Sequence, residues 1–227
     1  MTQITTGIRR ILSVPAAYDG LQAALGAVSG REQVYRDYIQ PQLGDVVVDV
    51  GCGTAVILDL LPESARYYGF DLSEDYITAA RSRYGGRGQF FCADITSIAK
   101  DAVPASTTTL ALGLLHHLDD DGCRHLLGAI HDRLAPGGRL VTLDGTFVPN
   151  QHWFSRMLVG ADRGRNVRTP EQYAALVPRG LQVVTHVRHD LLRVPYTHCI
   201  LVCTKTASRE GPDSAHIASH DAADGCK

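Results

Sequence analysis

Glycines and carboxylates follow short apolar runs in the first half of this sequence. The run at 46–50 carries Asp49 and leads directly into Gly51-Cys52-Gly53-Thr54. Glycine at positions 51 and 53 lets the main chain bend sharply and approach a ligand that any side chain would exclude. Asp71 stands 20 positions after Gly51 at the end of the next run, where a carboxylate can accept hydrogen bonds from both hydroxyls of a ribose. The spacing therefore predicts a nucleoside-binding site.

Such a site needs a scaffold that brings the ends of successive strands together, and the surrounding pattern predicts one. Apolar runs at 46–50, 66–72, 89–94, 107–114 and 139–143 alternate with helical stretches. This alternation is typical of a parallel sheet with helices on both faces. Ser73 before two acids predicts the start of a helix over 74–84, and a second helix over 122–134 ends at Ala-Pro-Gly-Gly.

The remaining segments predict a cap, an insertion and a closing hairpin. Residues 16–38 read as two short helices hinged near Ser29 and Gly30, and 153–159 reads as a further helix. Thr169 to Gln172 fits a capping box that opens a helix to about residue 177. Two closing strands at 181–187 and 198–204 form a plausible antiparallel pair. The predicted organisation is a helical cap over 1–45, one domain over 46–206 with a helical insertion at about 146–180, and a disordered tail over 207–227.

With these elements in place, residues 46–143 resemble the core of class I S-adenosylmethionine-dependent methyltransferases. Val-Asp-Val-Gly-Cys-Gly-Thr at 48–54 matches the first motif of that family, and Gly-Phe-Asp-Leu-Ser at 69–73 matches the acidic second motif. Segments 92–95, 112–118 and 134–140 match in the same order, and five ordered matches are far more specific than one. The resemblance implies a Rossmann-like α/β sheet, mostly parallel with an antiparallel terminal hairpin, and methyl transfer from S-adenosylmethionine.

Carried over position by position, the resemblance assigns a set of residues to the cofactor. It implies that Gly51 and Gly53 line the methionine part, that Asp71 meets the ribose and that Asp94 meets the adenine amino group. Asp49 either orders the glycine loop or meets the amino group of the ligand. The other cofactor residues implied by the same motifs are Leu72, Ile95 and Leu114. Asp71 and Asp94 also have a structural alternative, since each can cap the turn or helix that follows it.

Candidate residues for the chemistry and for the acceptor lie further along the chain. His116 and His117 fall where the fourth strand ends, beside the methyl-transfer site of the related family, so either is a candidate general base. A structural role is the alternative, because His-His-Leu recurs in that family. Trp153, Arg163 and Tyr196 are candidate acceptor contacts, because connections above a sheet usually carry specificity.

Arginines gather in the predicted insertion. Arg163, Arg165 and Arg168 can clamp a carboxylate or phosphate of the acceptor, because a guanidinium offers paired planar donors. The alternative is a solvated loop that pairs with Asp162. The run Asp119-Asp120-Asp121 is explained as a helix start and not as a metal site, and no metal is predicted.

Bulk properties narrow the class of protein. The formal net charge of -2 disfavours a nucleic acid as partner, because surfaces that neutralise many phosphates are strongly basic. No segment among the 227 residues is long and apolar enough to cross a bilayer. Six scattered cysteines without a CxxC pair indicate reduced thiols, and Cys52 reads as a small filler. We expect a cytoplasmic enzyme with a small-molecule acceptor.

Two other classes share the same signals. An NAD-dependent oxidoreductase also uses a glycine turn and an acid such as Asp71, but Val56 stands where that class has its third glycine. A protein that binds S-adenosylmethionine without transferring its methyl group has the same fold, because the site and not the fold sets the function. A methyltransferase that acts on RNA or protein is disfavoured by the charge balance and by the lack of an appended recognition domain.

Overall fold

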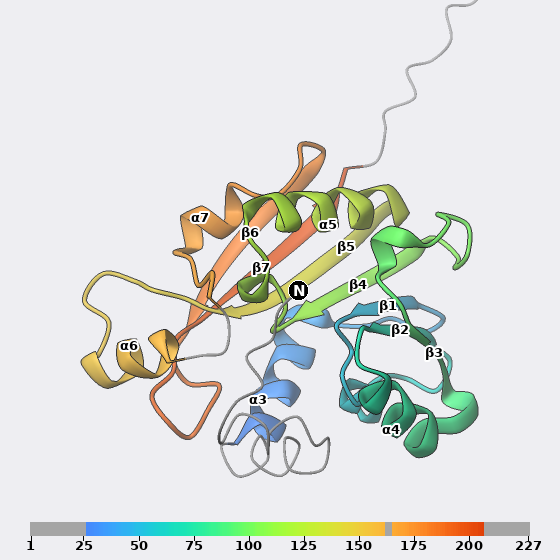
Figure 1. Cartoon of the computed structure of the whole chain (residues 1–227), viewed down its shortest axis with the longest axis horizontal. Coiled ribbons are helices and arrows are strands. Elements are labelled where there is room, and N and C mark those ends of the chain that lie inside the picture. The colour runs from blue at the N-terminus through green and yellow to red at the C-terminus, as the bar shows by residue number, and fades with distance from the viewer. Residues whose placement is uncertain (1–25, 162–164, 207–227) are drawn as a thin grey trace, which may run out of the picture.

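A seven-stranded sheet forms the centre of the molecule (Figure 1). The computed structural model describes residues 26–161 and 165–206. Along the sheet the order is β3-β2-β1-β4-β5-β7-β6, with β7 antiparallel to both of its neighbours and every other pairing parallel. The strands are β1 (Val46–Val50), β2 (Arg66–Asp71), β3 (Gly88–Cys92), β4 (Ser106–Leu112), β5 (Leu134–Gly145), β6 (Leu181–Arg188) and β7 (His198–Lys205). The predicted parallel sheet with a closing antiparallel hairpin is therefore confirmed.

Helices cover both faces of this sheet (Figure 1). They are α3 (Ala27–Val34), α4 (Glu74–Tyr84), α5 (Asp120–Arg133), α6 (Trp153–Gly160) and α7 (Pro170–Ala174). In β1, Val46, Val48 and Val50 pack with the apolar side of α5, while Val47 faces the opposite way and packs with α3 and α4. A strand buried on both faces reads as a continuous apolar run, which is why β1 shows no polar alternation.

Most predicted boundaries agree with the structure within two residues, and local chemistry explains them. Ser73 Oγ accepts from the Tyr76 amide at 3.4 Å, and Thr169 with Gln172 forms the predicted capping box. Two predictions were wrong in extent. Helix α7 ends at Ala174 and not near residue 177. Strand β5 begins at Leu134 and not at Arg139, because Leu134 pairs with Ser106 before a register shift, so Pro-Gly-Gly lies inside the strand.

The hinge predicted at Ser29 and Gly30 is also wrong. Helix α3 runs through both positions and continues as a π-helical turn over Tyr35–Ile39. Gly30 is buried, and a Cβ there would collide with the Leu191 carbonyl oxygen. Glycine therefore serves close packing at this position and not a bend. The rest of the predicted cap, residues 1–25, and the tail over 207–227 lie outside the described residues.

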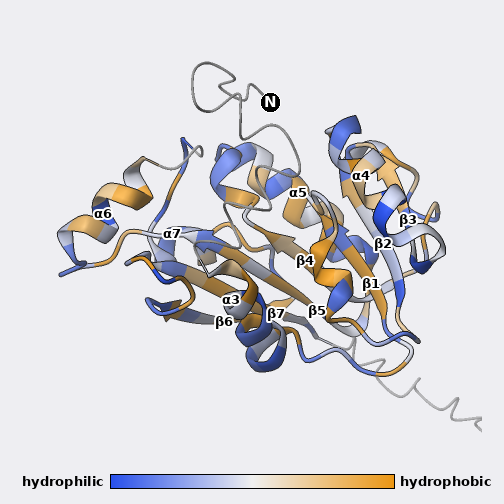
Figure 2. Cartoon of the chain, turned by 90° about the horizontal axis from the view of Figure 1, so that it is seen from below, coloured by the Kyte–Doolittle hydropathy of each residue, from blue (hydrophilic) through white to orange (hydrophobic). Residues whose placement is uncertain are grey.

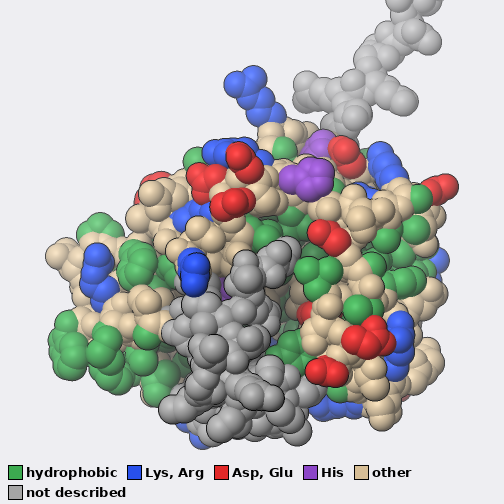
Figure 3. All heavy atoms as spheres, viewed as in Figure 1, with side chains coloured by type: hydrophobic (Ala, Val, Ile, Leu, Met, Phe, Trp, Pro, Cys, Tyr) green, Lys and Arg blue, Asp and Glu red, His purple; other side chains and the backbone are tan. Residues whose placement is uncertain are grey.

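The insertion between β5 and α7 projects from the body of the molecule. Helix α6 stands away from the sheet in both views (Figure 1, Figure 2), and hydrophobic side chains gather over it (Figure 3). Trp153 and Met157 on this helix are 71% and 51% exposed. Among the described residues, no helix has the length and apolar character needed to span a membrane.

Candidate active site

The carboxyl ends of β1, β2, β3, β4 and β5 meet at one edge of the sheet, because these strands are parallel. The glycine turn follows β1, Asp71 ends β2 and Asp94 follows β3. The turn Leu115–His117 follows β4, and Asp144 lies at the end of β5. The structure thus brings the predicted cofactor residues and the predicted histidines to one edge, where open α/β sheets bind ligands.

The glycine turn has the backbone conformation that its sequence requires. Gly51 and Gly53 have φ of 75° and 54°, in the left-handed region that favours glycine. The amides of Gly51 and Cys52 both donate to the Phe70 carbonyl, at 2.8 and 3.0 Å, and so anchor the turn to β2. A Cβ at Gly51 would lie 3.2 Å from Leu114 Cδ1, while a Cβ at Gly53 would meet nothing within 4 Å. Main chain is therefore open to a ligand at Gly53.

The segment after this turn is not the helix that its motif predicts. Ala55 has φ of 57°, and only a four-residue 3-10 turn, Val56–Asp59, follows before Pro62. Left-handed residues turn the chain away from a helical path, and too few residues remain before β2 begins at Arg66. A dinucleotide fold uses a helix N-terminus at this place to hold its pyrophosphate. No such helix is present in this segment, so the turn suits a cofactor without phosphates.

Asp94 caps the turn that follows it, which was its structural alternative, whereas Asp71 does not cap α4, because Ser73 is the N-cap of that helix. Asp71 accepts from the Gly53 amide at 2.9 Å and from the Ser73 amide at 2.8 Å, which ties the glycine turn to the start of α4. Asp94 accepts from the amide and the hydroxyl of Thr96, each at 2.8 Å. A carboxylate has about four acceptor positions. These bonds therefore orient both acids and leave them capacity to bind a ligand.

Asp49 is buried behind the glycine turn. It is 4% exposed, and its carboxylate accepts from the Tyr67 hydroxyl at 2.6 Å. Burial raises the pKa of Asp49 to about 7, with the Tyr67 hydrogen bond opposing this effect and the charge of Asp71 adding to it. An acid that is half neutral near pH 7 gains its charge readily when a cationic ligand approaches. A cofactor that bears ammonium and sulfonium groups is such a ligand.

This shift predicts that the ligand-free protein loses stability as pH rises. Below the ordinary pKa of Asp49, 3.8, its carboxyl is protonated in both the folded and the unfolded chain, so its contribution to the free energy of unfolding is fully present. This contribution is lost as pH rises to about 7, because the unfolded chain then releases a proton that the folded chain still holds. Between pH 5 and pH 7.5 we expect a loss of about 2–3 kcal/mol in the free energy of unfolding. Urea denaturation of the wild type and of Asp49→Asn at both pH values measures it. An equal pH dependence in both proteins would contradict the assignment.

The other cofactor residues implied by the motifs differ in what they offer. Leu72 is 53% exposed next to Asp71, and Leu114 packs over Gly51. Ile95 is buried in the core, so only its main chain is available to a ligand. Burial and the charges of Asp49 and Asp71 raise the pKa of the Cys52 thiol, which keeps it protonated and agrees with its reading as a filler.

His116 forms a buried pair with Asp144. Its Nδ1 lies 2.7 Å from Asp144 Oδ1, and its amide donates to the same oxygen at 3.1 Å. The two side chains are 8% and 2% exposed. Burial raises the pKa of Asp144 above its ordinary value, opposed by its hydrogen bonds to His116. A carboxylate that holds Nδ1 fixes the imidazole tautomer in which Nε2 is the acceptor nitrogen, the tautomer that a general base requires.

No motif in the sequence singles out Asp144 as the partner of His116. The partners are 28 positions apart, and the motif around His116 contains no sign of the acid. The only signal in the sequence was the position of Asp144 at the end of the predicted fifth strand of the sheet. Because neighbouring parallel strands end at the same edge, an acid there lies near a residue that follows the fourth strand. The His117 ring lies against that of His116, with centroids 4.2 Å apart and ring planes tilted by 39°.

The predicted acceptor residues are separated by the structure. The Tyr196 hydroxyl lies against Gly145, next to Asp144, and Tyr196 lines a cavity of about 290 Å³ between the insertion and the β6–β7 connection. Trp153 is exposed at the start of α6 and does not line this cavity. Arg163 lies outside the described residues. The other residues around the cavity include Gln151, His152, Ser155, His189 and Thr197.

The prediction that Arg168 clamps a carboxylate or phosphate of the acceptor is wrong. The prediction that the run Asp119-Asp120-Asp121 starts a helix is confirmed. Arg168 is buried and donates to main-chain carbonyls and to Asp120, which leaves no donor for an acceptor. Arg165 is exposed. Asp119 Oδ1 accepts from the Gly122 amide at 2.8 Å as the N-cap of α5, and Asp121 pairs with Arg124.

Comparison with known proteins places this fold. Residues 47–138 match the family model of a methyltransferase domain, whereas no curated protein matches the chain. The fold is similar to that of a SAM-dependent methyltransferase from Methanosarcina mazei, with a TM-score of 0.61 and 15% identity over 77% of this chain and 97% of that one. A second similar structure is a TehB-like SAM-dependent methyltransferase from Corynebacterium glutamicum, with a TM-score of 0.64 and 18% identity. The match covers 88% of this chain and 100% of that one.

A further similar structure is human N-acetylserotonin methyltransferase in complex with SAM, with a TM-score of 0.62 and 16% identity. The match covers 86% of this chain and 56% of that one. The family model spans the glycine turn, the predicted cofactor acids Asp71 and Asp94, and the turn that carries His116. Residues 47–138, which carry most of this site, therefore match a methyltransferase domain, and the fold is that of SAM-dependent methyltransferases.

Proposed function

We propose that this protein transfers the methyl group of S-adenosylmethionine to a small-molecule acceptor, with His116 as the general base. The observation that carries the proposal is the buried His116–Asp144 pair, which shares a sheet edge with the glycine turn. A general base is useful only where the acceptor must lose a proton, so the pair favours a hydroxyl or amine acceptor. The human enzyme with the same fold is likewise named for a small molecule.

The residues of the chain divide the work of the transfer. Gly51 and Gly53 admit the methionine part, Asp71 and Asp94 hold ribose and adenine, and Asp49 balances the positive charge of the ligand. S-adenosylmethionine supplies an electrophilic methyl group on a sulfonium that is already a good leaving group. Alignment of the acceptor with that methyl group therefore supplies much of the rate.

Proton transfer completes the reaction. The acceptor atom attacks the methyl carbon as the carbon–sulfur bond breaks, and His116 Nε2 takes the proton that the acceptor loses. Asp144 stabilises the imidazolium that forms, since its Oδ1 lies 2.7 Å from Nδ1. The cavity lined by Tyr196, Thr197 and His189 is the proposed acceptor site, because the Tyr196 hydroxyl lies against Gly145, the residue next to Asp144.

The polar lining of that cavity indicates a polar acceptor. Ser155 Oγ and Thr197 Oγ1 are 2.8 Å apart, and His189 Nδ1 lies 3.1 Å from the same Thr197 oxygen. Gln151 Nε2 donates to Ser155 at 3.2 Å. This chain of groups can exchange donors and acceptors with a ligand that bears hydroxyl or amine groups.

Cofactor binding is tested first. Calorimetric titration with S-adenosylhomocysteine and with NAD separates the methyltransferase from the oxidoreductase class, and binding of NAD alone would refute the proposal. Turnover is then measured as methyl-labelled product after incubation with labelled S-adenosylmethionine and, in separate reactions, with fractions of small polar metabolites, of protein and of RNA. Label recovered only in protein or RNA would refute the small-molecule acceptor, and binding without any label transfer would favour the non-methylating alternative.

Replacing Asp71 by alanine is expected to weaken S-adenosylhomocysteine binding by about 1–3 kcal/mol, or about 5- to 150-fold. The change removes acceptors for the ribose and releases the Gly53 amide, which now donates to Asp71 at 2.9 Å. Asp59→Ala is the matched control, because Asp59 is a half-exposed acid that pairs with Arg83 and bonds to neither the glycine turn nor Ser73 in the contacts described. Unchanged affinity in a folded Asp71→Ala protein would remove Asp71 from the site.

A further inference from the structure

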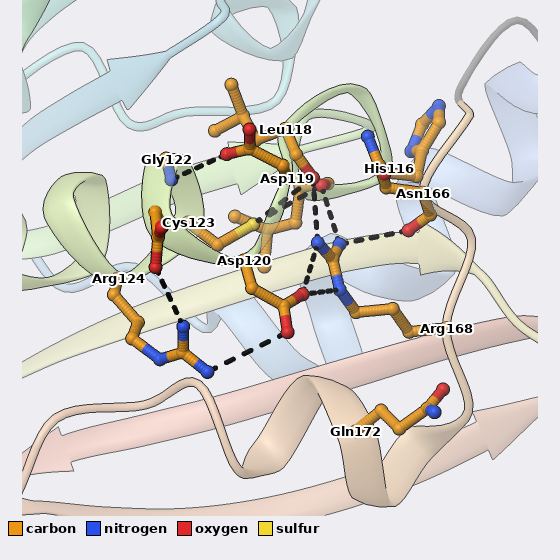
Figure 4. A network of polar contacts seen from close by, with 12 residues as sticks. His116, Leu118, Asp119, Asp120, Gly122, Cys123, Arg124, Asn166, Arg168 and Gln172 are labelled. Atoms are coloured by element: carbon orange, nitrogen blue, oxygen red, sulfur yellow. Dashed lines mark hydrogen bonds and ion pairs between the residues drawn. The ribbon is translucent and has the colours of Figure 1, made fainter.

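The guanidinium of Arg168 is fully occupied by contacts within the protein. Its Nε donates to Asp120 Oδ1 at 2.9 Å, and its Nη1 donates to the carbonyls of Leu115 and Asn166 at 3.1 and 2.9 Å. Its Nη2 donates to the Leu118 carbonyl at 2.8 Å and lies 2.8 Å from Asp120 Oδ1. All three nitrogens of the guanidinium therefore donate hydrogen bonds, and the Nη2–Asp120 contact adds an ion pair (Figure 4). A side chain that is 8% exposed and fully bonded is held in one geometry.

These contacts converge on the turn that carries His116. The Asn166 amide donates to the His116 carbonyl at 3.1 Å, so the carbonyls of residues 115, 116 and 118 all bond to residues 166–168. A three-residue 3-10 turn satisfies few of its own carbonyls, and buried carbonyls need donors. The donors are the Asn166 amide and the Arg168 side chain, which lie in the insertion about 50 positions later in the sequence and contact the turn only in the folded protein.

The main chain of Arg168 is fixed to the strand that carries Asp144. The Thr146 hydroxyl donates to the Arg168 carbonyl at 2.8 Å, and the Phe147 amide donates to the same oxygen at 3.3 Å. Thr146 and Arg168 also form a parallel bridge. One residue therefore connects the segment of His116, through its side chain, with the segment of Asp144, through its main chain.

We propose that Arg168 is a positioning residue that holds His116 against Asp144 and so links the insertion to the proposed base. This inference rests on the proposed function only where catalysis is concerned, because the geometry of the pair can be measured without cofactor or acceptor. A role confined to anchoring helix α5 predicts a loss of stability alone. A positioning role predicts, in addition, a change at the His116 ring.

The experiment follows the His116 Nδ1 proton by NMR in protein with ¹⁵N-labelled histidine, assigned by its loss in His116→Gln. We expect Arg168→Met to speed exchange of this proton with water by at least about tenfold, and Arg168→Lys to have a smaller effect, because three donors replace five. Affinity for S-adenosylhomocysteine is expected to stay within about twofold, since the glycine turn, Asp71 and Asp94 make no contact with Arg168.

A second pair of variants guards against misfolding of the Arg168 proteins. Asp120→Ala removes one acceptor of Arg168, whereas Asp121→Ala removes the neighbouring acid in the same helical turn, whose side chain is 97% exposed and pairs with Arg124. Both changes weaken the α5 dipole interaction equally, so only Asp120→Ala is expected to speed the exchange. Unchanged proton exchange in folded Arg168→Lys and Asp120→Ala would overturn the proposal and leave cofactor binding by the wild type untouched.

Discussion

Replacement of His116 by glutamine is expected to lower kcat by about 10²- to 10⁴-fold, the usual contribution of a general base. Glutamine retains a donor toward Asp144 but cannot accept a proton at neutral pH. Affinity for S-adenosylhomocysteine is expected to change by less than about twofold, because the predicted cofactor acids Asp49, Asp71 and Asp94 lie on or just after β1, β2 and β3, whereas His116 follows β4. Initial rates with the acceptor found by label transfer, together with calorimetry, measure both quantities.

His117→Gln is the matched control for this change. The two rings are adjacent, with centroids 4.2 Å apart, but the carboxylate of Asp144 pairs with His116. We expect His117→Gln to keep kcat within about threefold of the wild type, well below the loss for a missing general base. Equal losses in both variants would point to a structural role for the His-His pair, which was the alternative raised by the sequence.

Replacement of Gly51 by valine is expected to abolish cofactor binding, with a loss of affinity of more than about 100-fold. The residue has φ of 75°, a conformation in which a β-branched side chain is strained by roughly 1–2 kcal/mol or more. The new Cβ would also lie 3.2 Å from Leu114 Cδ1. Valine therefore distorts the turn that the methionine part of the cofactor must approach. Calorimetric titration with S-adenosylhomocysteine measures the loss.

Gly137→Val is the matched control, because it introduces the same backbone strain as Gly51→Val at a position away from the proposed cofactor site. Gly137 has φ of 74°, and a Cβ there would meet nothing within 4 Å. It lies near the start of β5, at the opposite edge of the sheet from the carboxyl ends. Both variants are expected to lose a similar amount of unfolding free energy, but only Gly51→Val is expected to lose the cofactor. Normal binding by a folded Gly51→Val protein would refute the role of the glycine turn.

The sequence predicted the strands and the cofactor acids because their signals are local. A buried parallel strand is a short apolar run, and glycine at a left-handed position or serine before acids identifies a turn or a helix start without reference to distant residues. Arg168 shows the limit of this approach. Its residue type suggested an anion clamp, and nothing nearby in sequence revealed that all three guanidinium nitrogens already bond within the protein.

By itself, the sequence determined the sheet, the order of its motifs and the edge at which the predicted cofactor residues meet, since each follows from residues that are neighbours along the chain. Only the tertiary structure decided which histidine has a buried acid, which arginine is internal and why Gly30 is glycine. Each of those outcomes depends on groups brought together from positions tens to more than a hundred residues apart. Burial then gives such pairings their strength, because buried polar groups must find partners within the protein.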